Sequence, residues 1–301
     1  MPFGLPSGKD LRKFICEAFS QSSSLSVILN QSLGYGLPEI REFANAFKKS
    51  QLASIDAFLS MHDRFREIGK SSISVVLSQR ENPDFVINDN NDHWYQMLWN
   101  ILCEDAKSVG DLKQNKIKFI SFNYDRSLEY FLFESCKHTF GVSDGEALNI
   151  VKYFNILHVY GKLGEFCYPG FSSNDARPYS LDTSRNLVKI GADGIKVIHE
   201  MRDDDCKDFE IAKNWFNTSE KIGFLGFGFD KINVRRLGLI DVLNHRRKQN
   251  SEKDVPRIVA TMLDMTLSEI NHHHANVCPG FAWDPYDMKN TLALRESGLL
   301  R

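Results

Sequence analysis

This sequence lacks the features that indicate a zinc ribbon, a membrane span or a nucleic-acid surface. Its six cysteines are scattered and none forms a C-x-x-C pair, which argues against a structural zinc site and favours free thiols in the cytoplasm. No apolar stretch approaches the roughly 20 residues that a bilayer requires, and the first six residues resemble no secretory signal. The net charge is −2 and no long run of Lys and Arg occurs, so charge gives no reason to expect contact with nucleic acid or a membrane.

The composition that is present is ordinary for a globular protein. The chain has 301 residues, of which 42% are hydrophobic and 25% are charged. That length fits one large domain, or one domain that carries a sizeable insertion. We therefore expect a single domain over residues 1–301, with no metal and a cytoplasmic location.

The hydrophobic pattern changes character along the chain. Apolar residues at helical spacing fill most of residues 37–110, apart from a loop expected at 82–92, which is rich in Asn and Asp. From about residue 116, short apolar runs typical of strands alternate with helical segments. Strands are expected at 117–120, 155–159, 222–227 and 257–261, and helices at 127–136, 209–216, 234–244 and 267–276. This alternation predicts a Rossmann-like parallel sheet with helices on both faces and a helical insertion or cap at residues 37–110.

Three of the expected strands end in polar or glycine-rich residues. The first continues into Ser121, Asn123 and Asp125, and the other two end at residues 158–161 and 226–230. Open α/β sheets bind their ligands at the carboxyl ends of strands. An Asn amide there offers both donors and an acceptor to a sugar hydroxyl or to water. The three ends together suggest one nucleotide-sized cleft.

These segments resemble sirtuin-like NAD-hydrolysing domains, in particular the bacterial branch found in antiphage defence, which has no zinc ribbon. The resemblance touches nearly the whole chain, and its two most specific parts are the Asn-Tyr-Asp and Gly-Phe-Gly-Phe-Asp segments. It is carried by residues 3–8, 121–125 with 128–129, 157–161, 226–230 with Asn233, and 266–269.

The resemblance implies NAD binding and cleavage of the nicotinamide–ribose bond. It gives Asn123 the role of positioning the attacking water or the nicotinamide ribose, and Asp125 the strand-to-helix turn. Gly226 and Gly228 would let the backbone approach the adenosine half because neither has a Cβ. The implied NAD-binding residues are Ser121, Asp125, Tyr160, Gly161, Gly226, Phe227, Gly228, Asp230 and Asn233.

One departure from the family concerns the catalytic histidine. The family places a His directly before a Gly, where this sequence has Tyr160, and the nearest His is His158. Residues two apart on a strand share a face, so His158 would line the same cleft about 7 Å away. His transfers protons near neutral pH whereas Tyr does not. We therefore predict that Asn123 and His158 are catalytic and that Tyr160 is a hydrogen-bonding neighbour.

A second departure keeps two functions open. The family's first strand and glycine-rich phosphate turn would precede Phe3, but the sequence begins at Met1, so we expect either a shortened chain or a weakened or inactive relative. The first expectation is an NAD glycohydrolase that acts as an abortive-infection effector, as a homo-oligomer or with a defence partner. The alternative is a non-catalytic subunit that senses NAD or ADP-ribose or serves assembly. A protein deacylase is disfavoured by the missing zinc cysteines.

Structural explanations compete with these roles. Asn123 or Asp125 could simply cap the helix that follows, and His158 could be a hydrogen-bonded core residue. The run His272-His273-His274 cannot converge on one ion from a helix, because adjacent residues point about 100° apart. The run Asp203-Asp204-Asp205 lacks the alternating ligands of a calcium loop.

Overall fold

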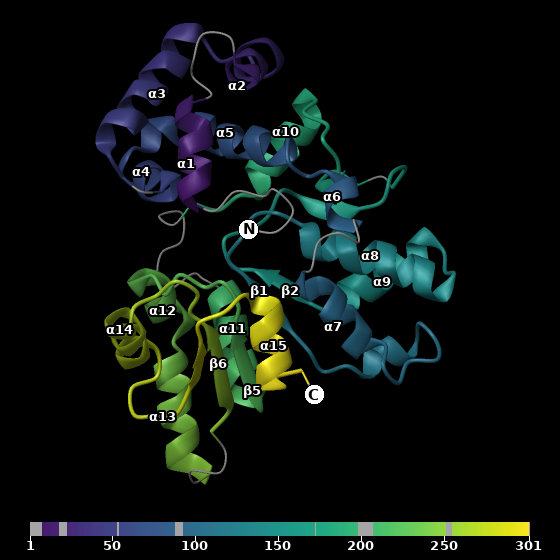
Figure 1. Cartoon of the computed structure of the whole chain (residues 1–301). Helices are drawn as coiled ribbons and strands as arrows, with labels where there is room; N and C mark the ends of the chain where they lie inside the picture. Colours follow the sequence, from purple (N-terminus) through teal and green to yellow (C-terminus); the bar gives the residue numbers. More distant parts are fainter. Residues whose placement is uncertain are drawn as a thin grey trace. The chain divides into compact units, whose positions relative to one another are not determined.

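Two structural units share the chain, each built from two separated segments. The computed structural model describes residues 8–17, 23–52, 54–87, 93–171, 173–197, 207–250 and 255–300. Unit 1 comprises Met1–Asn91 and Phe119–Arg202, and unit 2 comprises Asp92–Lys118 and Asp203–Arg301 (Figure 1). The segment expected as one insertion, residues 37–110, therefore contributes to both units. Residues 3–7 and 203–206 of the sequence interpretation lie outside the described residues.

The N-terminal part of unit 1 is a helical layer. Its predicted helical character over residues 37–79 is confirmed, and four phenylalanines from it, Phe43, Phe47, Phe58 and Phe65, are buried together with ring centroids 5.1–6.3 Å apart. The helices are α1 (Gly8–Glu17), α2 (Ser24–Val27), a π-helix (Ile28–Ser32), α3 (Leu37–Ser50), α4 (Ile55–Met61), a 3-10 turn (Asp63–Phe65), α5 (Arg66–Ser78) and α6 (Pro83–Ile87). The last of these corrects the loop expected at 82–92. Pro83 suits a first helical turn and Val86 is buried, so packing overrides the loop-like composition.

The second part of unit 1 holds short parallel strands. Strand β1 (Phe119–Ser121) pairs in parallel with β2 (Ile156–His158), and β3 (Glu165–Cys167) pairs in parallel with β4 (Ala176–Pro178). The connection from β1 to β2 contains α8 (Ser127–Phe140) and α9 (Asp144–Tyr153), which pack on each other. Helix α10 (Arg185–Gly194) packs on α5. The predicted helix at 127–136 is confirmed, whereas α9, β3, β4 and α10 were not predicted.

Unit 2 is a three-stranded parallel sheet with helices. Its strands lie in the order β5 (Lys221–Phe224), β6 (Arg257–Thr261), β7 (Asp284–Tyr286). Its helices are α7 (Trp94–Leu102), α11 (Lys207–Thr218), α12 (Lys231–Leu237), α13 (Leu239–Asn250), α14 (Leu267–Val277) and α15 (Asn290–Ser297), with a 3-10 turn at Asp111–Gln114. Helix α15 packs on both β6 and α7, which ties the segment at 92–118 into this unit.

The predicted strand at 257–261 is confirmed residue for residue. The helix expected at 234–244 is interrupted, because Gly238 adopts φ +58° and ends α12 before α13 begins. β7 and α15 were not predicted.

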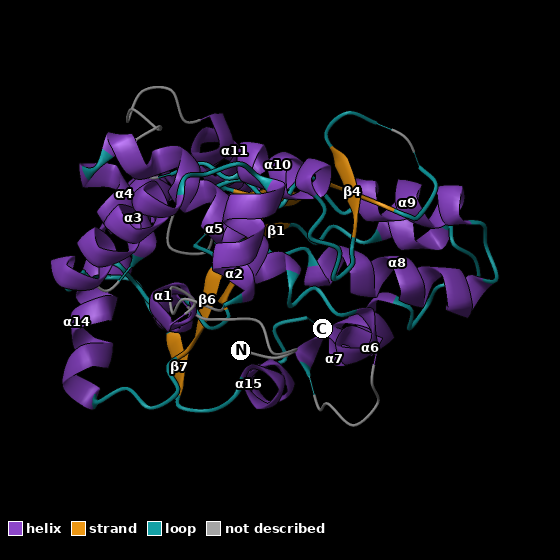
Figure 2. Ribbon diagram, turned by 90° about the horizontal axis from the view of Figure 1, so that it is seen from above, coloured by secondary structure: helices purple, strands orange, loops and turns teal. Residues whose placement is uncertain are grey.

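The chain is therefore a mixed α/β protein with short parallel strands in small sheets. Figure 2 shows the strands as short arrows and the helices as the larger part of the drawing. In the described part of the chain, no helix combines the length and apolar character that a bilayer crossing requires.

Candidate functional site

The site in unit 1 lies at the carboxyl ends of β1 and β2. The register pairs Ser121 with His158, so both strands end at the same edge of their small sheet. The chain leaves β1 through Phe122 and Asn123 and enters α8 at Ser127. The side chain of Ser121 accepts a hydrogen bond from the backbone N–H of Asn123 at 3.2 Å, which tightens this exit. The segment at 123–126 is the part of the site that the sequence pattern singled out.

Three of the four side chains in this segment have polar partners, while Asn123 is exposed. The hydroxyl of Tyr124 donates to Oδ1 of Asp56 at 2.5 Å, which links the loop to α4. Oδ1 of Asp125 accepts from the backbone N–H of Ser127 at 3.1 Å and from its hydroxyl at 2.5 Å. Asp125 therefore holds the turn into α8, and the amide of Asn123 faces solvent.

Arg126 completes the anchoring from inside the unit. Its guanidinium makes two bonds to the carboxylate of Glu81, at 3.1 and 2.5 Å, and donates to the carbonyl oxygens of Arg177 and Pro178. The guanidinium of Arg177 lies 3.5 Å from the same carboxylate and donates to the hydroxyl of Ser78. The side chains of Glu81, Arg126 and Arg177 are completely buried. Two buried cations thus share one carboxylate, and desolvation lowers the pKa of Arg177 to about 10.

His158 connects the same loop to α8. Its Nδ1 lies 2.7 Å from the backbone carbonyl oxygen of Asn123, and its Nε2 lies 2.8 Å from Oε1 of Glu129. A carbonyl oxygen can only accept a hydrogen bond, and the same holds for an ionised carboxylate. With Glu129 ionised, both ring nitrogens therefore donate, and the imidazole is an imidazolium. The side chains of His158 and Glu129 are only 3% and 5% exposed. Both ring nitrogens are occupied, which leaves neither free to take a proton from a substrate in this state.

The electrostatics of this pair agree with its geometry. Burial alone would lower the pKa of His158, but the charge of Glu129, its hydrogen bond and the Asn123 carbonyl together raise that pKa above the ordinary value. Burial alone would raise the pKa of Glu129, but the charge and hydrogen bond of His158 bring it below the ordinary value. For Asp125, burial outweighs the bonds from Ser127 and raises the pKa. The charged form of the pair is therefore the stable one.

The residues that follow β2 are occupied by packing. Tyr160 is 6% exposed, and its ring meets the edge of Phe122 with centroids 5.8 Å apart. Gly161 adopts φ +74° and bridges to Ile195, and an added Cβ there would overlap the carbonyl oxygen of Gly194. The structure thus explains this glycine by close backbone packing.

The glycine-rich segment lies at the carboxyl end of β5, in unit 2. The backbone N–H of Gly226 donates to the hydroxyl of Thr261 at 2.8 Å, and a Cβ added at Gly228 would meet nothing within 4 Å. Oδ1 of Asp230 accepts from the backbone N–H groups of Ile232 and Asn233, so Asp230 caps α12. The side chain implied to bind NAD is thus engaged in a helix cap.

An aromatic cluster surrounds this segment. Phe227 meets Phe229 edge-on at 4.9 Å, and Phe229 lies 5.2 Å from His273 and 5.9 Å from Trp283. Phe229 adopts φ +49°, which is rare for a bulky side chain. The run at 272–274 lies in α14, where Nε2 of His274 bonds the carbonyl oxygen of Phe281 at 2.7 Å.

Compared with protein-family models, with curated proteins and with solved structures, the chain gives no significant match. Its function must therefore be argued from the site itself. The sequence-derived residues divide between the two units: 121–161 belong to unit 1 and 226–233 to unit 2.

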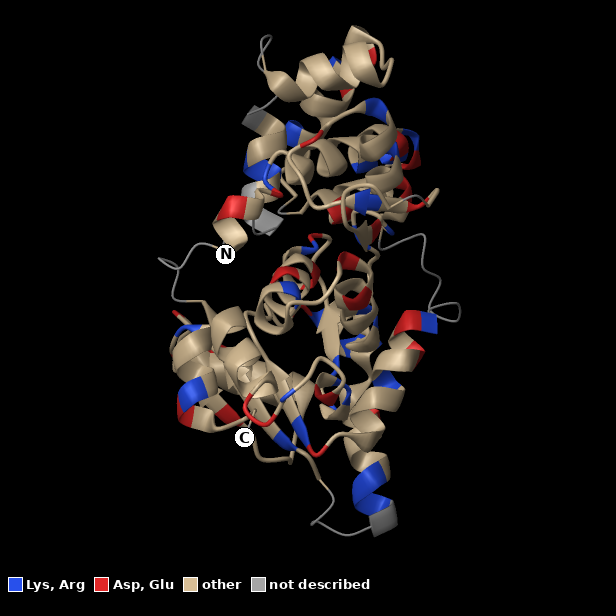
Figure 3. Cartoon of the chain, turned by 90° about the vertical axis from the view of Figure 1, so that its right-hand side faces the viewer, with Lys and Arg blue, Asp and Glu red and all other residues tan. Residues whose placement is uncertain are grey.

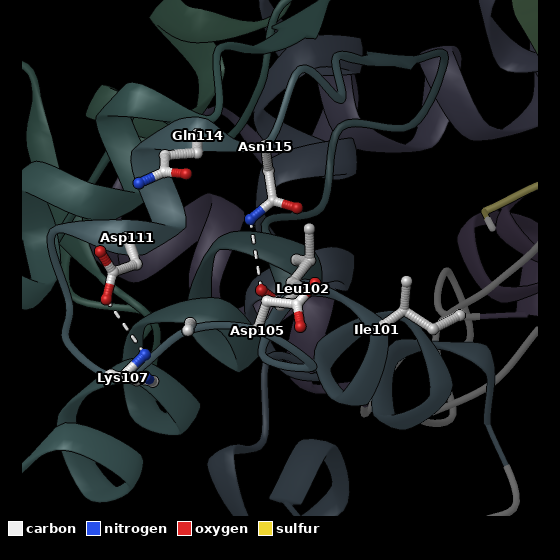
Figure 4. A pocket seen from close by; sticks show the side chains of 8 residues that line it. Ile101, Leu102, Asp105, Lys107, Asp111, Gln114 and Asn115 are labelled. Atoms are coloured by element: carbon white, nitrogen blue, oxygen red, sulfur yellow. Dashed lines mark hydrogen bonds between the residues drawn. The ribbon is translucent and has the colours of Figure 1, made fainter.

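A cavity of about 280 Å³ lies elsewhere, beyond the end of α7 in unit 2. Asp105, Asp111, Gln114 and Asn115 are among its lining residues (Figure 4). The amide of Asn115 donates to the carbonyl oxygen of Leu102, and Asp111 accepts from backbone N–H groups, so these side chains mainly close the loop. The predicted site residues do not line this cavity.

Over the ranges that the structure describes, charge and cysteine chemistry add no second site. Lys and Arg residues are interspersed with Asp and Glu residues along the ribbon (Figure 3). Among the described residues, no group of three or more His, Cys, Asp or Glu side chains is placed to hold a metal ion. The five described cysteines are free thiols, as expected from their spacing.

Sequence reasoning missed the inner partners of the loop. Glu129 was noticed only as part of the resemblance, and Asp56, Glu81 and Arg177 were not noticed at all. One local signal was present for Glu129, since it stands among Leu128, Phe131 and Leu132 in a strongly apolar helix. A buried acid in such a helix needs a cationic or donor partner.

Proposed function

We propose that this protein binds NAD and cleaves its nicotinamide–ribose bond, releasing nicotinamide and ADP-ribose. One observation supports the proposal most. An exposed amide, Asn123, stands at the carboxyl end of a parallel strand pair, while its neighbours Tyr124, Asp125 and Arg126 are tied to groups of unit 1. A polar group presented from a rigid support is what a reaction that depends on orientation requires.

The proposed reaction is dissociative and requires little acid–base catalysis by the protein. Nicotinamide leaves, an oxocarbenium-like ribosyl cation forms, and water captures it. Asn123 would orient the nicotinamide ribose or the attacking water through its amide. His158 would act through Asn123, because its two ring nitrogens are engaged by the Asn123 carbonyl and by Glu129.

The finer fold assignment belongs to the same proposal. Every pairing between named strands of the described residues is parallel, as a Rossmann-like sheet requires. We propose that Gly226, Phe227, Gly228 and Asn233 form a nucleotide contact within unit 2. Open space at Gly228 supports this, since a backbone without a Cβ can approach a ligand closely there.

The experiment is to incubate the purified chain with NAD and to measure nicotinamide by chromatography. Asn123→Ala is expected to lower kcat by about 100-fold, the usual loss when one positioned donor is removed from a reacting centre. Asn149→Ala is the matched control, because Asn149 is also an exposed amide of unit 1 but lies on α9. Equal turnover in both variants would remove Asn123 from the mechanism.

The second candidate is a non-catalytic subunit that senses NAD or ADP-ribose, or serves assembly. The occupied imidazole of His158 favours it, because neither of its ring nitrogens is free to act as a base. Calorimetry with NAD and with ADP-ribose separates the two functions. Binding of either ligand without nicotinamide release would support the sensor.

The biological setting we propose is antiphage defence in the bacterial cytoplasm. An enzyme that consumes NAD would stop the growth of the infected cell, so its activity would have to stay low until a trigger or a partner protein acts. The partner would be a second copy of this chain or another protein of the defence system. Cellular NAD measured before and after infection tests this setting, and an unchanged NAD pool would count against it.

A further inference from the structure

A buried chain of three groups runs from α8 to the Asn123 loop. Oε1 of Glu129 accepts from Nε2 of His158 at 2.8 Å, and Nδ1 of His158 donates to the carbonyl oxygen of Asn123 at 2.7 Å. The three residues come from three elements: α8, β2 and the segment after β1. None of the three bonding groups belongs to the exposed amide itself.

The direction of these bonds depends on charge. The Asn123 carbonyl cannot donate, so the bond exists only while Nδ1 carries a proton. Nε2 faces a carboxylate, so it is also protonated as long as Glu129 is ionised. Oε2 of Glu129 is buried and receives no hydrogen bond from the described residues, which leaves the imidazolium as the group that neutralises this carboxylate at contact distance.

We propose that Glu129 is a positioning residue, which keeps His158 doubly protonated so that His158 fixes the Asn123 carbonyl and with it the direction of the Asn123 amide. The meaning of this role for catalysis rests on the proposed function, whereas the three-group chain itself does not. Two other charged groups face His158: Asp125 from the turn before α8, and Lys162 after β2. Lys162 pairs with Glu165 at 2.9 Å, and both Lys162 and Asp125 act on His158 through their charge.

The chain can be followed without any substrate. Asn123-Tyr124 is the only Asn–Tyr dipeptide in the sequence. Labelling asparagine carbonyls with ¹³C and tyrosine amides with ¹⁵N therefore gives one carbonyl–amide NMR signal, which reports the Asn123 carbonyl alone. In the wild type we expect this signal to shift with pH in one step, with its midpoint above the ordinary value of 6.5, because the charged pair raises the pKa of His158.

Three variants at two glutamates of the same helix form the test. Glu129→Gln keeps the shape but removes the charge, so the step is expected to move to lower pH, and Glu129→Asp should return it part of the way. Glu134→Gln is the matched control, because Glu134 also pairs with a histidine of α8, at 3.2 Å, but that partner, His138, is 75% exposed. The control should leave the step unchanged.

Each outcome decides one proposal. A wild-type carbonyl signal with no pH step, or a step that stays in place in Glu129→Gln, overturns the role of Glu129, and the wild-type titration needs no variant to fold. If the steps behave as expected but the wild type releases no nicotinamide, the three-group chain stands and the proposed function fails. If nicotinamide is released, the upper limit of its pH profile should move to lower pH in Glu129→Gln and stay in place in Glu134→Gln.

Discussion

The buried carboxylate of Glu81 offers the sharpest test of how the loop is held. Glu81 faces Arg126 at 2.5 Å and Arg177 at 3.5 Å, and all three side chains are fully buried. Glu81→Gln removes the charge but keeps an acceptor oxygen, and it leaves two guanidinium groups without a counter-charge. Breaking a buried pair from one side costs about 3–5 kcal/mol. A domain is stable by only about 5–15 kcal/mol, so this loss is a large fraction of the total.

Hydrogen exchange is the appropriate assay because it reports unit 1 separately. The four tryptophans, at 94, 99, 215 and 283, all lie in unit 2, so their fluorescence follows that unit. Backbone amides of α5 and α8 follow unit 1. Since each 1.4 kcal/mol is about a factor of ten, a cost of 3–5 kcal/mol accelerates their exchange by about two to three and a half decades.

The matched control is a surface pair of the same unit. Glu42 pairs with Arg64 at 2.8 Å, but these side chains are 57% and 64% exposed. Glu42→Gln is expected to change the free energy of unfolding by less than about 1 kcal/mol. Equal acceleration of α8 exchange in the two variants would refute the reasoning that burial of the charge sets its importance.

Three further predictions concern the same unit. Gly161→Ala should lower the free energy of unfolding by more than about 2 kcal/mol, and Gly141→Ala by only about 1 kcal/mol, as measured by urea denaturation followed by circular dichroism. Both glycines have positive φ, but neighbouring atoms block an added Cβ only at Gly161. Equal losses would contradict the packing argument. Tyr124→Phe should lower the free energy of unfolding by about 1–3 kcal/mol in the same assay, because it removes a hydrogen bond from the buried carboxyl group of Asp56. An unchanged free energy of unfolding would contradict this prediction. The raised pKa of His158 means that its stabilisation is complete below the unfolded value of 6.5 and is lost as pH rises through the raised value. The difference in unfolding free energy between the wild type and His158→Gln should therefore shrink as pH rises above about 6.5, and a constant difference would contradict the assignment.

Elements with strong local patterns were predicted from the sequence. The strand at 257–261 is rich in β-branched residues and follows Pro256, and the helix at 127–136 has apolar residues at helical spacing. Helix α9 was missed although its start carries a Ser-x-x-Glu capping box at Ser143 and Glu146. That signal was available and a systematic search for capping boxes would have found it.

Local sequence patterns could not predict which buried side chains pair with one another at the site. Arg126 and Glu81 are 45 residues apart, and His158 and Glu129 are 29 apart. Which acid meets which base depends on how the helices pack, and one sequence contains no periodicity that fixes such pairings. The ring of His158 lies 2.7 Å from the backbone carbonyl of Asn123, and the state of its ring nitrogens follows only from Glu129. Catalysis by His158 stays a prediction.

Burying the charges of Arg126, Glu81, His158 and Glu129 costs desolvation free energy, and this cost suggests why the loop at 123–126 is held by polar bonds. A well-packed apolar pair is often as stabilising as a buried ion pair, or more so. Stability alone therefore does not explain why Arg126, three residues after Asn123, bonds the buried acid Glu81, and why His158 bonds both the buried acid Glu129 and the Asn123 carbonyl. Directional bonds do what apolar contacts do not: they fix where a carbonyl and its neighbouring side chain point. Sequences depart from the cheapest packing mainly where a function needs geometry, and in the described part of unit 1 the exposed group whose geometry these bonds define is the amide of Asn123.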